Sequence, residues 1–118
     1  MTCGRLFFRI IRGPTPTLDD FKSHKARGKP LLDESQRRLW ERGISVYDSL
    51  DAARRTAQRY QRLGSHIVVL RVESDPGIEV EQTGPMHRFT LYADAQTLLA
   101  IVEGAVIPVR EETRDDAV

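Results

Sequence analysis

At 118 residues, with 40% apolar and 30% charged side chains, the chain has the size and composition of one globular domain and is too short for two good cores. These fractions exclude a disordered chain, and no apolar run reaches the roughly 18 residues needed to span a bilayer. The N-terminus has no signal-peptide pattern, and a lone Cys3 cannot form an internal disulfide, so we expect a cytoplasmic protein.

The net charge of +1 hides an uneven distribution. Residues 1–65 carry 14 Lys/Arg against 7 Asp/Glu, a sum of +7, and residues 66–118 carry 4 against 10, a sum of −6. The positive excess lies mainly in segments that we interpret as helical. It is expected either to form a basic face for a phosphate, a polyanion or an acidic partner, or to be an ordinary solvated surface that pairs with the acidic half.

The first third of the chain predicts a strand followed by two short helices. Residues 5–11 form an aromatic and β-branched run closed by a Gly-Pro pair, which is typical of a buried strand. A Thr and an Asp at capping-box spacing predict a helix over about 17–27. A second short helix is expected over about 33–43, with Trp40 as a buried anchor.

The next strand feeds the helix with the clearest pattern. Residues 44–47 alternate in the manner of a half-buried strand. Directly afterwards, four apolar residues recur at spacings of three and four and form the stripe of a helix that ends near Gly64. These residues are Leu50, Ala53, Ala57 and Tyr60.

The second half predicts four further strands and one short helix. The strands are expected over 66–72, 78–81, 88–92 and 105–109, and the helix over about 94–102, ended by Gly104. The second of these strands is expected at a sheet edge, and Pro108 in the last strand indicates that this strand lies at an edge or ends early. The whole pattern predicts a single α+β domain over 1–110, with one small mixed sheet of five to six strands and three to four short helices, followed by a disordered charged tail over 111–118.

No metal site is predicted. His24, His66 and His87 lie in unrelated elements, and none has a second His or Cys at a chelating spacing. A Gly-rich phosphate loop is also missing, because Gly13 is followed by Pro14, which has no backbone donor. Polar residues in and beside the apolar strands are therefore the candidates for function.

Arg9 interrupts the first apolar strand. A guanidinium there is costly to bury unless it is paired or binds an anion. Two interpretations follow. Arg9 either lies on the solvated face and pairs with Glu79 or Glu81 across the sheet, or it holds a phosphate or carboxylate with its forked donors.

Ser45 and Tyr47 face the same way at the end of a strand that leads into a helix N-terminus. Free N–H groups and the helix dipole make such a place suitable for an anion. Alternatively, Tyr47 packs on an aromatic side chain and Ser45 bonds locally. His87 is either a turn histidine or a general base, because its side chain titrates near neutrality.

The order of these features resembles the ADP-ribosyltransferase-like superfamily, and within it the RES-type toxin domains. In that group an early strand carries an Arg, as in residues 6–10, which read LFFRI here. A second strand then ends in Tyr or Ser and enters a short helix with small and acidic residues, as in residues 43–53, which read GISVYDSLDAA. The resemblance covers about residues 5–60.

The resemblance implies an NAD site. Arg9 would contact the pyrophosphate or ribose of NAD, Tyr47 would lie near the nicotinamide, and Ser45 would line the same cleft. His87 is a further candidate for binding the cofactor.

The catalytic carboxylate that the resemblance implies has less clear candidates. RES-type domains place a Glu in the helix after the Tyr, where this chain has Arg54 and Arg55. The wider superfamily uses a late Glu on a strand, for which Glu81 or Glu79 are candidates by position. Either carboxylate would stabilise the oxocarbenium-like centre formed as nicotinamide leaves.

Three hypotheses of function follow. The first is an NAD-dependent ADP-ribosyltransferase or NAD glycohydrolase. The second is a non-catalytic binding module that uses Arg55, Arg59 and Arg62 on one helix face for an acidic protein or a nucleic acid; few aromatic residues are free to stack on bases, which argues against a single-strand platform. The third is a structural or interaction protein with no separate site. Convergence of Arg9, Tyr47 and an acidic side chain on one cleft would favour the first.

Overall fold

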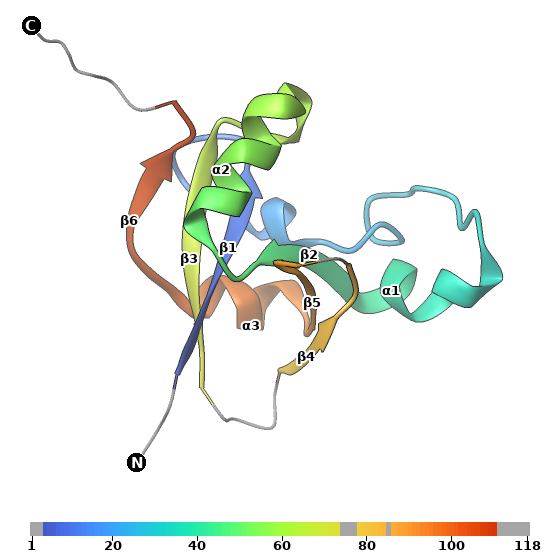
Figure 1. The fold of residues 1–118 in the computed structure, drawn as a ribbon. Coiled ribbons are helices and arrows are strands. Elements are labelled where there is room, and N and C mark those ends of the chain that lie inside the picture. Colours follow the sequence, from blue (N-terminus) through green and yellow to red (C-terminus); the bar gives the residue numbers. More distant parts are fainter. Residues whose placement is uncertain (1–3, 74–77, 85, 111–118) are drawn as a thin grey trace, which may run out of the picture.

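The computed structural model describes residues 4–73, 78–84 and 86–110, which form an α+β domain around one six-stranded sheet (Figure 1). The strands are β1 Arg5–Ile11, β2 Gly43–Tyr47, β3 His66–Val72, β4 Glu79–Gln82, β5 Arg88–Tyr92 and β6 Val102–Pro108. The α-helices are α1 Arg37–Arg42, α2 Leu50–Arg59 and α3 Ala95–Ala100, and the short 3-10 helices are η1 Leu18–Phe21, η2 Glu34–Gln36 and η3 Gln61–Leu63. The predicted α+β class with a single sheet is confirmed.

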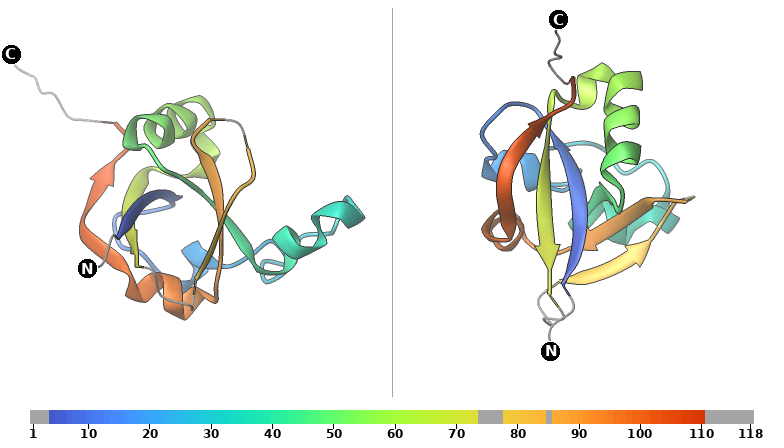
Figure 2. Two further views of the ribbon diagram at one scale, coloured as in Figure 1. Left: turned by 60° about the horizontal axis from the view of Figure 1, so that its bottom comes forward. Right: turned by 60° about the vertical axis from the view of Figure 1, so that its left-hand side comes forward.

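The strands follow the order β4-β5-β2-β1-β3-β6, and every pairing registered among the described residues is antiparallel. The expectation of a mixed sheet is therefore corrected in this respect. Helix α2 does join two strands that run in the same direction, β2 and β3, but β1 lies between them and pairs with both. The sheet is strongly curved, as the views in Figure 2 show, and β4 and β6 form its edges as predicted.

Apolar side chains cover both faces of the sheet. The larger cluster combines strand residues such as Phe7 and Leu91 with Phe21 from η1 and Leu98 from α3, all of them fully buried. In the smaller cluster, α2 packs on the sheet through the small side chains of Ala53 and Ala57. They contact a surface that includes Ile10 of β1 and Ile67 of β3. Removing this apolar surface from water is the main contribution to stability.

Helix α2 begins as predicted and ends early. The Ser49 side chain accepts a hydrogen bond from the backbone N–H of Ala52 at 3.2 Å and caps the helix. The apolar stripe is confirmed at Ala53 and Ala57, which are buried. Tyr60 has left the helical conformation, with φ −121° and ψ 78°, and its side chain is 50% exposed. The expectation that Tyr60 packs in the core is therefore wrong.

The helix expected over 17–27 is only the 3-10 turn η1. The predicted capping box is present, with the Thr17 backbone N–H donating to Oδ2 of Asp20 at 2.8 Å. A longer helix would use the Asp20 carbonyl to accept the N–H of His24. Arg9 takes that carbonyl instead, with Nε and Nη2 at 3.1 and 3.0 Å, and Lys22 is extended. A side chain from another element thus ends this helix.

Two smaller differences concern Trp40 and Gly104. Trp40 is half-buried rather than enclosed, because the excursion that carries α1 projects away from the sheet (Figure 1). Gly104, expected to end a helix, lies inside β6 with φ 77°. The expected tail, 111–118, lies outside the described residues, and within those residues no helix is long and apolar enough to cross a membrane.

Candidate functional site: a cationic cleft

A split between β1 and β2 opens a cleft on one side of the sheet. Strand β1 pairs with β3 along all seven of its residues, whereas its register with β2 is the single pair Phe8–Tyr47. Beyond this pair the two strands diverge. A cavity of about 800 Å³ lies there, lined by the end of β1, the start of β2, the 20–29 loop, and the end of α2 with η3.

Lysine and arginine side chains dominate the lining of this cleft. They are Arg9, Arg12, Lys22, Arg27, Lys29, Arg62 and Arg88. Asp20 is the only acidic residue among the described lining residues. Its carboxylate is already engaged, with Oδ2 accepting from Thr17 and Oδ1 accepting from the backbone N–H of Arg12 at 3.4 Å. The cleft is therefore strongly cationic.

Most of the cleft cations have no carboxylate partner among the described residues. Among the described residues, Lys22 is the only one of the seven with a carboxylate partner, Asp19 at 3.4 Å. Arg27 donates to backbone carbonyls alone. Outside the cleft the pairing is mixed. Ion pairs join Arg37 with Glu34, Arg38 with Glu79, Arg55 with Asp51 and Arg71 with Glu103, whereas Arg5, Arg42 and Arg59 have no carboxylate partner among the described residues. Unpaired cations around one cavity favour an anionic ligand.

Arg9 lies at the floor of the cleft, where the two strands part. Besides its two bonds to Asp20, its Nη1 donates to the carbonyl of Ser45 at 2.8 Å. These bonds tie β1 to β2 and to η1 where the ladder between the strands is missing. A guanidinium has five N–H donors, so two remain for a ligand. The expected pairing of Arg9 with Glu79 or Glu81 is not formed.

No carboxylate among the described residues forms an ion pair with Arg9, although Asp20 lies near enough to act on its charge. Burial, followed by the charge of Arg27, lowers the pKa of Arg9 to about 10, although Asp20 and Tyr47 act in the opposite direction. Arg9 is still cationic at neutral pH. A bound anion would offset the charge of Arg27 and favour the protonated guanidinium, so the folded protein holds a charge that a ligand can stabilise.

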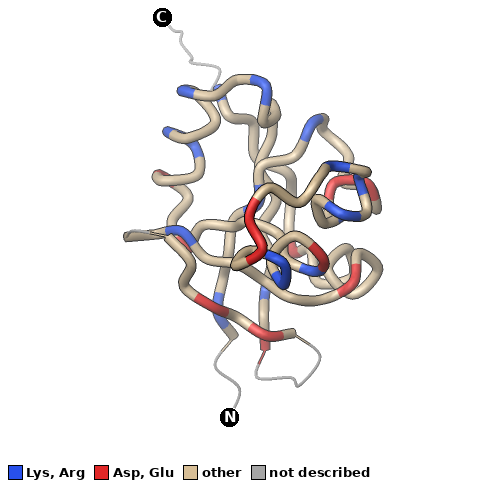
Figure 3. Tube along the Cα trace, turned by 90° about the vertical axis from the view of Figure 1, so that its right-hand side faces the viewer, with Lys and Arg blue, Asp and Glu red and all other residues tan. Residues whose placement is uncertain are grey.

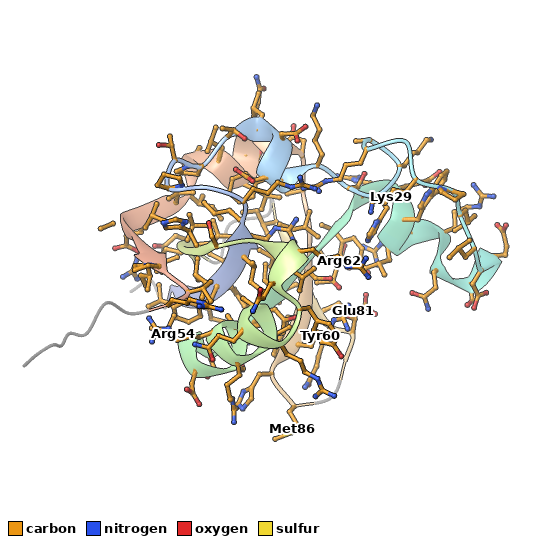
Figure 4. The ribbon with its side chains drawn as sticks, turned by 90° about the horizontal axis from the view of Figure 1, so that it is seen from above. Lys29, Arg54, Tyr60, Arg62, Glu81 and Met86 are labelled. Carbon is orange, nitrogen blue, oxygen red and sulfur yellow. The ribbon has the colours of Figure 1, made fainter. Side chains whose placement is uncertain are left out.

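Two tyrosine rings line the cleft beside the cations. Tyr47 is half-buried, and Tyr60 is half exposed at the end of α2. Figure 4 shows Tyr60 and Arg62 on the side of α2 towards Lys29, with Arg54 on the other side. The cleft thus offers flat apolar surface as well as positive charge.

The acidic residues proposed from the sequence lie outside the described lining of the cleft. Glu79 is held by Arg38. Glu81 is on the edge strand β4, where its Oε1 accepts the hydroxyl of Tyr92 at 2.7 Å. Burial, together with this hydrogen bond, raises the pKa of Tyr92 to about 12. The structure brings Arg9, Ser45 and Tyr47 together, but neither candidate carboxylate joins them.

His87 is also absent from the described lining residues. Its Nδ1 lies 2.7 Å from Oδ1 of Asp48, and its carbonyl accepts the backbone N–H of the same residue. The pair fastens the turn before β5 to the segment before α2. His87 is therefore a turn histidine in this structure, which was one of the two interpretations.

The cleft opens at the C-terminal end of α2 and not at its N-terminus as expected. Thr56, Tyr60 and Leu63 line it, whereas the first turn of the helix does not. This placement follows from the register of β1 and β2. Tyr47, at the end of β2, pairs with the middle of β1, so the two strands diverge at the start of β2, away from the first turn of α2. Side chains must therefore supply the attraction for an anion, since the helix dipole presents its negative end.

The predicted arginine face of α2 is divided. Arg55 pairs with Asp51, Arg59 lies with its guanidinium 5.5 Å from the centre of the Tyr60 ring, and Arg62 lines the cleft. Figure 3 shows Lys and Arg positions along α2, at the upper left, and in the excursion that faces the viewer. The positions of the loop and strand-end cations in the cleft could not be predicted from local patterns, and the charge excess of residues 1–65 was the one signal for them.

The fold and the cleft together define a class of protein: a small α+β domain with a cationic cleft, of ligand-binding size, at a split in its sheet. Among the described residues, no group of three or more His, Cys, Asp and Glu side chains could hold a metal ion. No family model, curated protein or solved structure matches the chain.

Proposed function

We propose that the cleft binds the phosphates of a nucleotide, with NAD as the ligand. The observation that carries the proposal is the set of six Lys and Arg side chains around one cavity that have no carboxylate partner among the described residues. The cavity of about 800 Å³ lies within the roughly 300–1,000 Å³ typical of small-molecule sites. The resemblance of residues 5–60 to the ADP-ribosyltransferase-like superfamily is the reason for choosing NAD among nucleotides.

Different lining residues would contact different parts of the ligand. Arg9 is fixed by three hydrogen bonds and offers two further N–H groups, which suits a pyrophosphate oxygen. Arg27 and Lys29 add charge from the opposite wall. The rings of Tyr47 and Tyr60 suit a nicotinamide or adenine, because both are flat and partly apolar.

The proposal concerns binding and assigns no bond cleavage. NAD cleavage needs a carboxylate beside the ribose to stabilise the developing positive charge. Asp20, the acidic residue among the described lining residues, uses its carboxylate in the η1 cap. The geometry therefore supports a nucleotide-binding domain better than a transferase.

Calorimetric titration of NAD into the protein tests this function. We expect saturable binding that ADP-ribose and inorganic pyrophosphate compete away, because the phosphates supply the main contacts. The thermal midpoint should rise with NAD concentration, since a ligand that binds the folded state stabilises it. No heat and no thermal shift at millimolar NAD would contradict the proposal.

The affinity for NAD is expected to increase as the pH falls through the range in which His24 titrates. Burial, and then the charges of Lys29, Arg27 and Arg9, lower the pKa of His24 in the free protein. A bound pyrophosphate offsets these charges and raises that pKa, so binding takes up a proton. NMR titration of the His24 imidazole, with and without NAD, measures the shift directly.

His24→Ala should remove this pH dependence, and His66→Ala is its matched control because His66 is outside the described lining. An identical His24 titration curve in the two states would contradict the expected coupling. The same is true if His66→Ala removes the pH dependence as well.

A further inference from the structure

The cleft carries more unpaired cations than a dinucleotide can neutralise. Six of its seven Lys and Arg side chains have no carboxylate partner among the described residues, and a dinucleotide brings one negative charge on each of two phosphates. Each cation placed against nucleic acid neutralises about one phosphate. The remaining charge therefore points to a ligand with additional phosphates in a row.

The cations are spread from the floor of the cleft to its mouth. Arg9 is half-buried at the floor, whereas Arg12, Lys29, Arg62 and Arg88 are exposed and make no ion pair among the described residues. Arg12 directly follows β1, and the other three lie in the 20–29 loop, η3 and β5. Figure 4 shows Arg62 between α2 and the excursion that carries Lys29. This arrangement suits a chain of phosphates that enters the cleft rather than a compact anion.

Apolar surface lies exposed beside these cations. The side chains of Tyr60 and Leu63 are 50% and 44% exposed, and both line the cleft. Arg59 lies over the Tyr60 ring, so one face of that ring is beside a positive charge. An exposed ring in a positive groove is the usual arrangement for binding unpaired bases. The sequence alone argued against this arrangement because it placed Tyr60 in the core.

We infer that the cleft receives the end of a single-stranded nucleic acid, with the terminal phosphates on Arg9 and its neighbours and a base against Tyr60. A single strand is required because the bases of a duplex are stacked on each other and cannot reach the ring. The inference goes beyond NAD binding and does not depend on it. Because both ligands would use Arg9, they should compete.

Fluorescence anisotropy with a short, fluorescein-labelled single-stranded oligothymidine tests the inference at several salt concentrations. We expect binding that weakens steeply with salt, and much weaker binding of a blunt duplex of the same length. Tyr60→Leu should reduce the affinity for the single strand by roughly ten-fold, because stacking against a base is lost. Absence of binding at low salt, or equal affinity for the duplex, would overturn the inference.

Two matched triple variants separate the cleft from general electrostatic attraction. The cleft variant is Arg12→Gln, Arg62→Gln, Arg88→Gln, and the control, which removes the same charge from ion-paired positions, is Arg37→Gln, Arg55→Gln, Arg71→Gln. The cleft variant should lower the salt slope by about 2, and the control should leave it nearly unchanged. Equal losses in the two variants would overturn the inference, provided that thermal melting shows both to be folded.

Titration of the unchanged protein with NAD and with the oligothymidine distinguishes this inference from the proposed NAD site. If the protein binds NAD but not the oligothymidine, the inferred nucleic-acid site is overturned and the NAD site stands. If it binds the oligothymidine but not NAD, the proposed NAD function is overturned and the nucleic-acid site is supported.

Discussion

Replacement of Arg9 by glutamine is expected to lower the affinity for NAD by at least about ten-fold, since hydrogen bonds to a charged group contribute about 1.5–3 kcal/mol. Arg9 is the one cation at the floor of the cleft that three backbone hydrogen bonds hold in place, so its two free donors meet the ligand without being ordered first. Calorimetric titration of the variant with NAD measures the loss.

The same change should also lower stability. Glutamine leaves the carbonyls of Asp20 and Ser45 with fewer donors, at a cost of about 1–3 kcal/mol, so the variant should remain folded but melt earlier. Arg71→Gln is the matched control, because Arg71 is exposed and pairs with Glu103 outside the described lining of the cleft. If Arg9→Gln melts earlier but binds NAD as tightly as the unchanged protein, Arg9 is a structural residue and the proposed anion site is wrong.

Local sequence patterns predicted those parts of the fold that depend on local periodicity. Strands Arg5–Ile11 and Arg88–Tyr92 have the predicted boundaries, and Ala53 and Ala57 lie on the buried face of α2. In each case the alternation or the helical spacing reflects which face is buried, so a short window contains the information.

The helix expected over 17–27 shows why other elements could not be predicted in this way. Its capping box is local and is present, but the carbonyl of Asp20 that should continue the helix is bound by Arg9. That competition depends on a strand eleven residues earlier in the chain. Propensity yields to tertiary contacts of this kind.

The cleft was predictable only in part, because its position also depends on contacts between elements that are distant in the sequence. Arg9, Ser45 and Tyr47 converge because they lie where β1 and β2 meet, which the order of the elements suggested. The position of the split, and hence the placement of the cleft beside the C-terminal end of α2, depends on register between distant strands. Glu81 stood out by its late position alone, and the topology puts it on the edge strand β4, with Tyr92 as its partner.

Charge asymmetry was the most useful compositional signal. Six of the seven cations that line the cleft belong to the first 65 residues, and Arg88 is the exception. The excess was expected in the helical segments, and the binding-module hypothesis used the face with Arg55, Arg59 and Arg62, but Arg55 there pairs with Asp51. Composition thus left open either a basic face for an anion or a solvated surface, and the fold shows which cations have no carboxylate partner among the described residues.

Gly64→Ala is expected to destabilise the protein by at least about 3 kcal/mol, because it combines a strained backbone with a backbone clash. Gly64 has φ +154°, and a Cβ there would lie 2.1 Å from the carbonyl oxygen of Ile11. No side-chain rotation can relieve a contact between a Cβ and the backbone. The 64–65 segment must therefore move away from the end of β1.

That movement would break the bonds of Ser65, which join the start of β3 to the ends of β1 and β6 next to the cleft. The backbone N–H of Ser65 donates to the Ile11 carbonyl at 3.0 Å, its hydroxyl donates to the Arg12 carbonyl at 2.8 Å, and its own carbonyl accepts from Val109. Thermal melting should show a midpoint lower by more than about 10 °C, and NAD binding should weaken because Arg12 and Leu63 shift with the segment.

Gly104→Ala is the matched control for this experiment. Gly104 also has a positive φ, +77°, but nothing lies within 4 Å of a Cβ built there, so alanine meets only the left-handed backbone cost of about 1–2 kcal/mol. The midpoint of Gly104→Ala should therefore fall by clearly less than that of Gly64→Ala, with NAD affinity unchanged. Equal losses of stability in the two variants would mean that the contact of Gly64 with the end of β1 does not hold this side of the cleft in place.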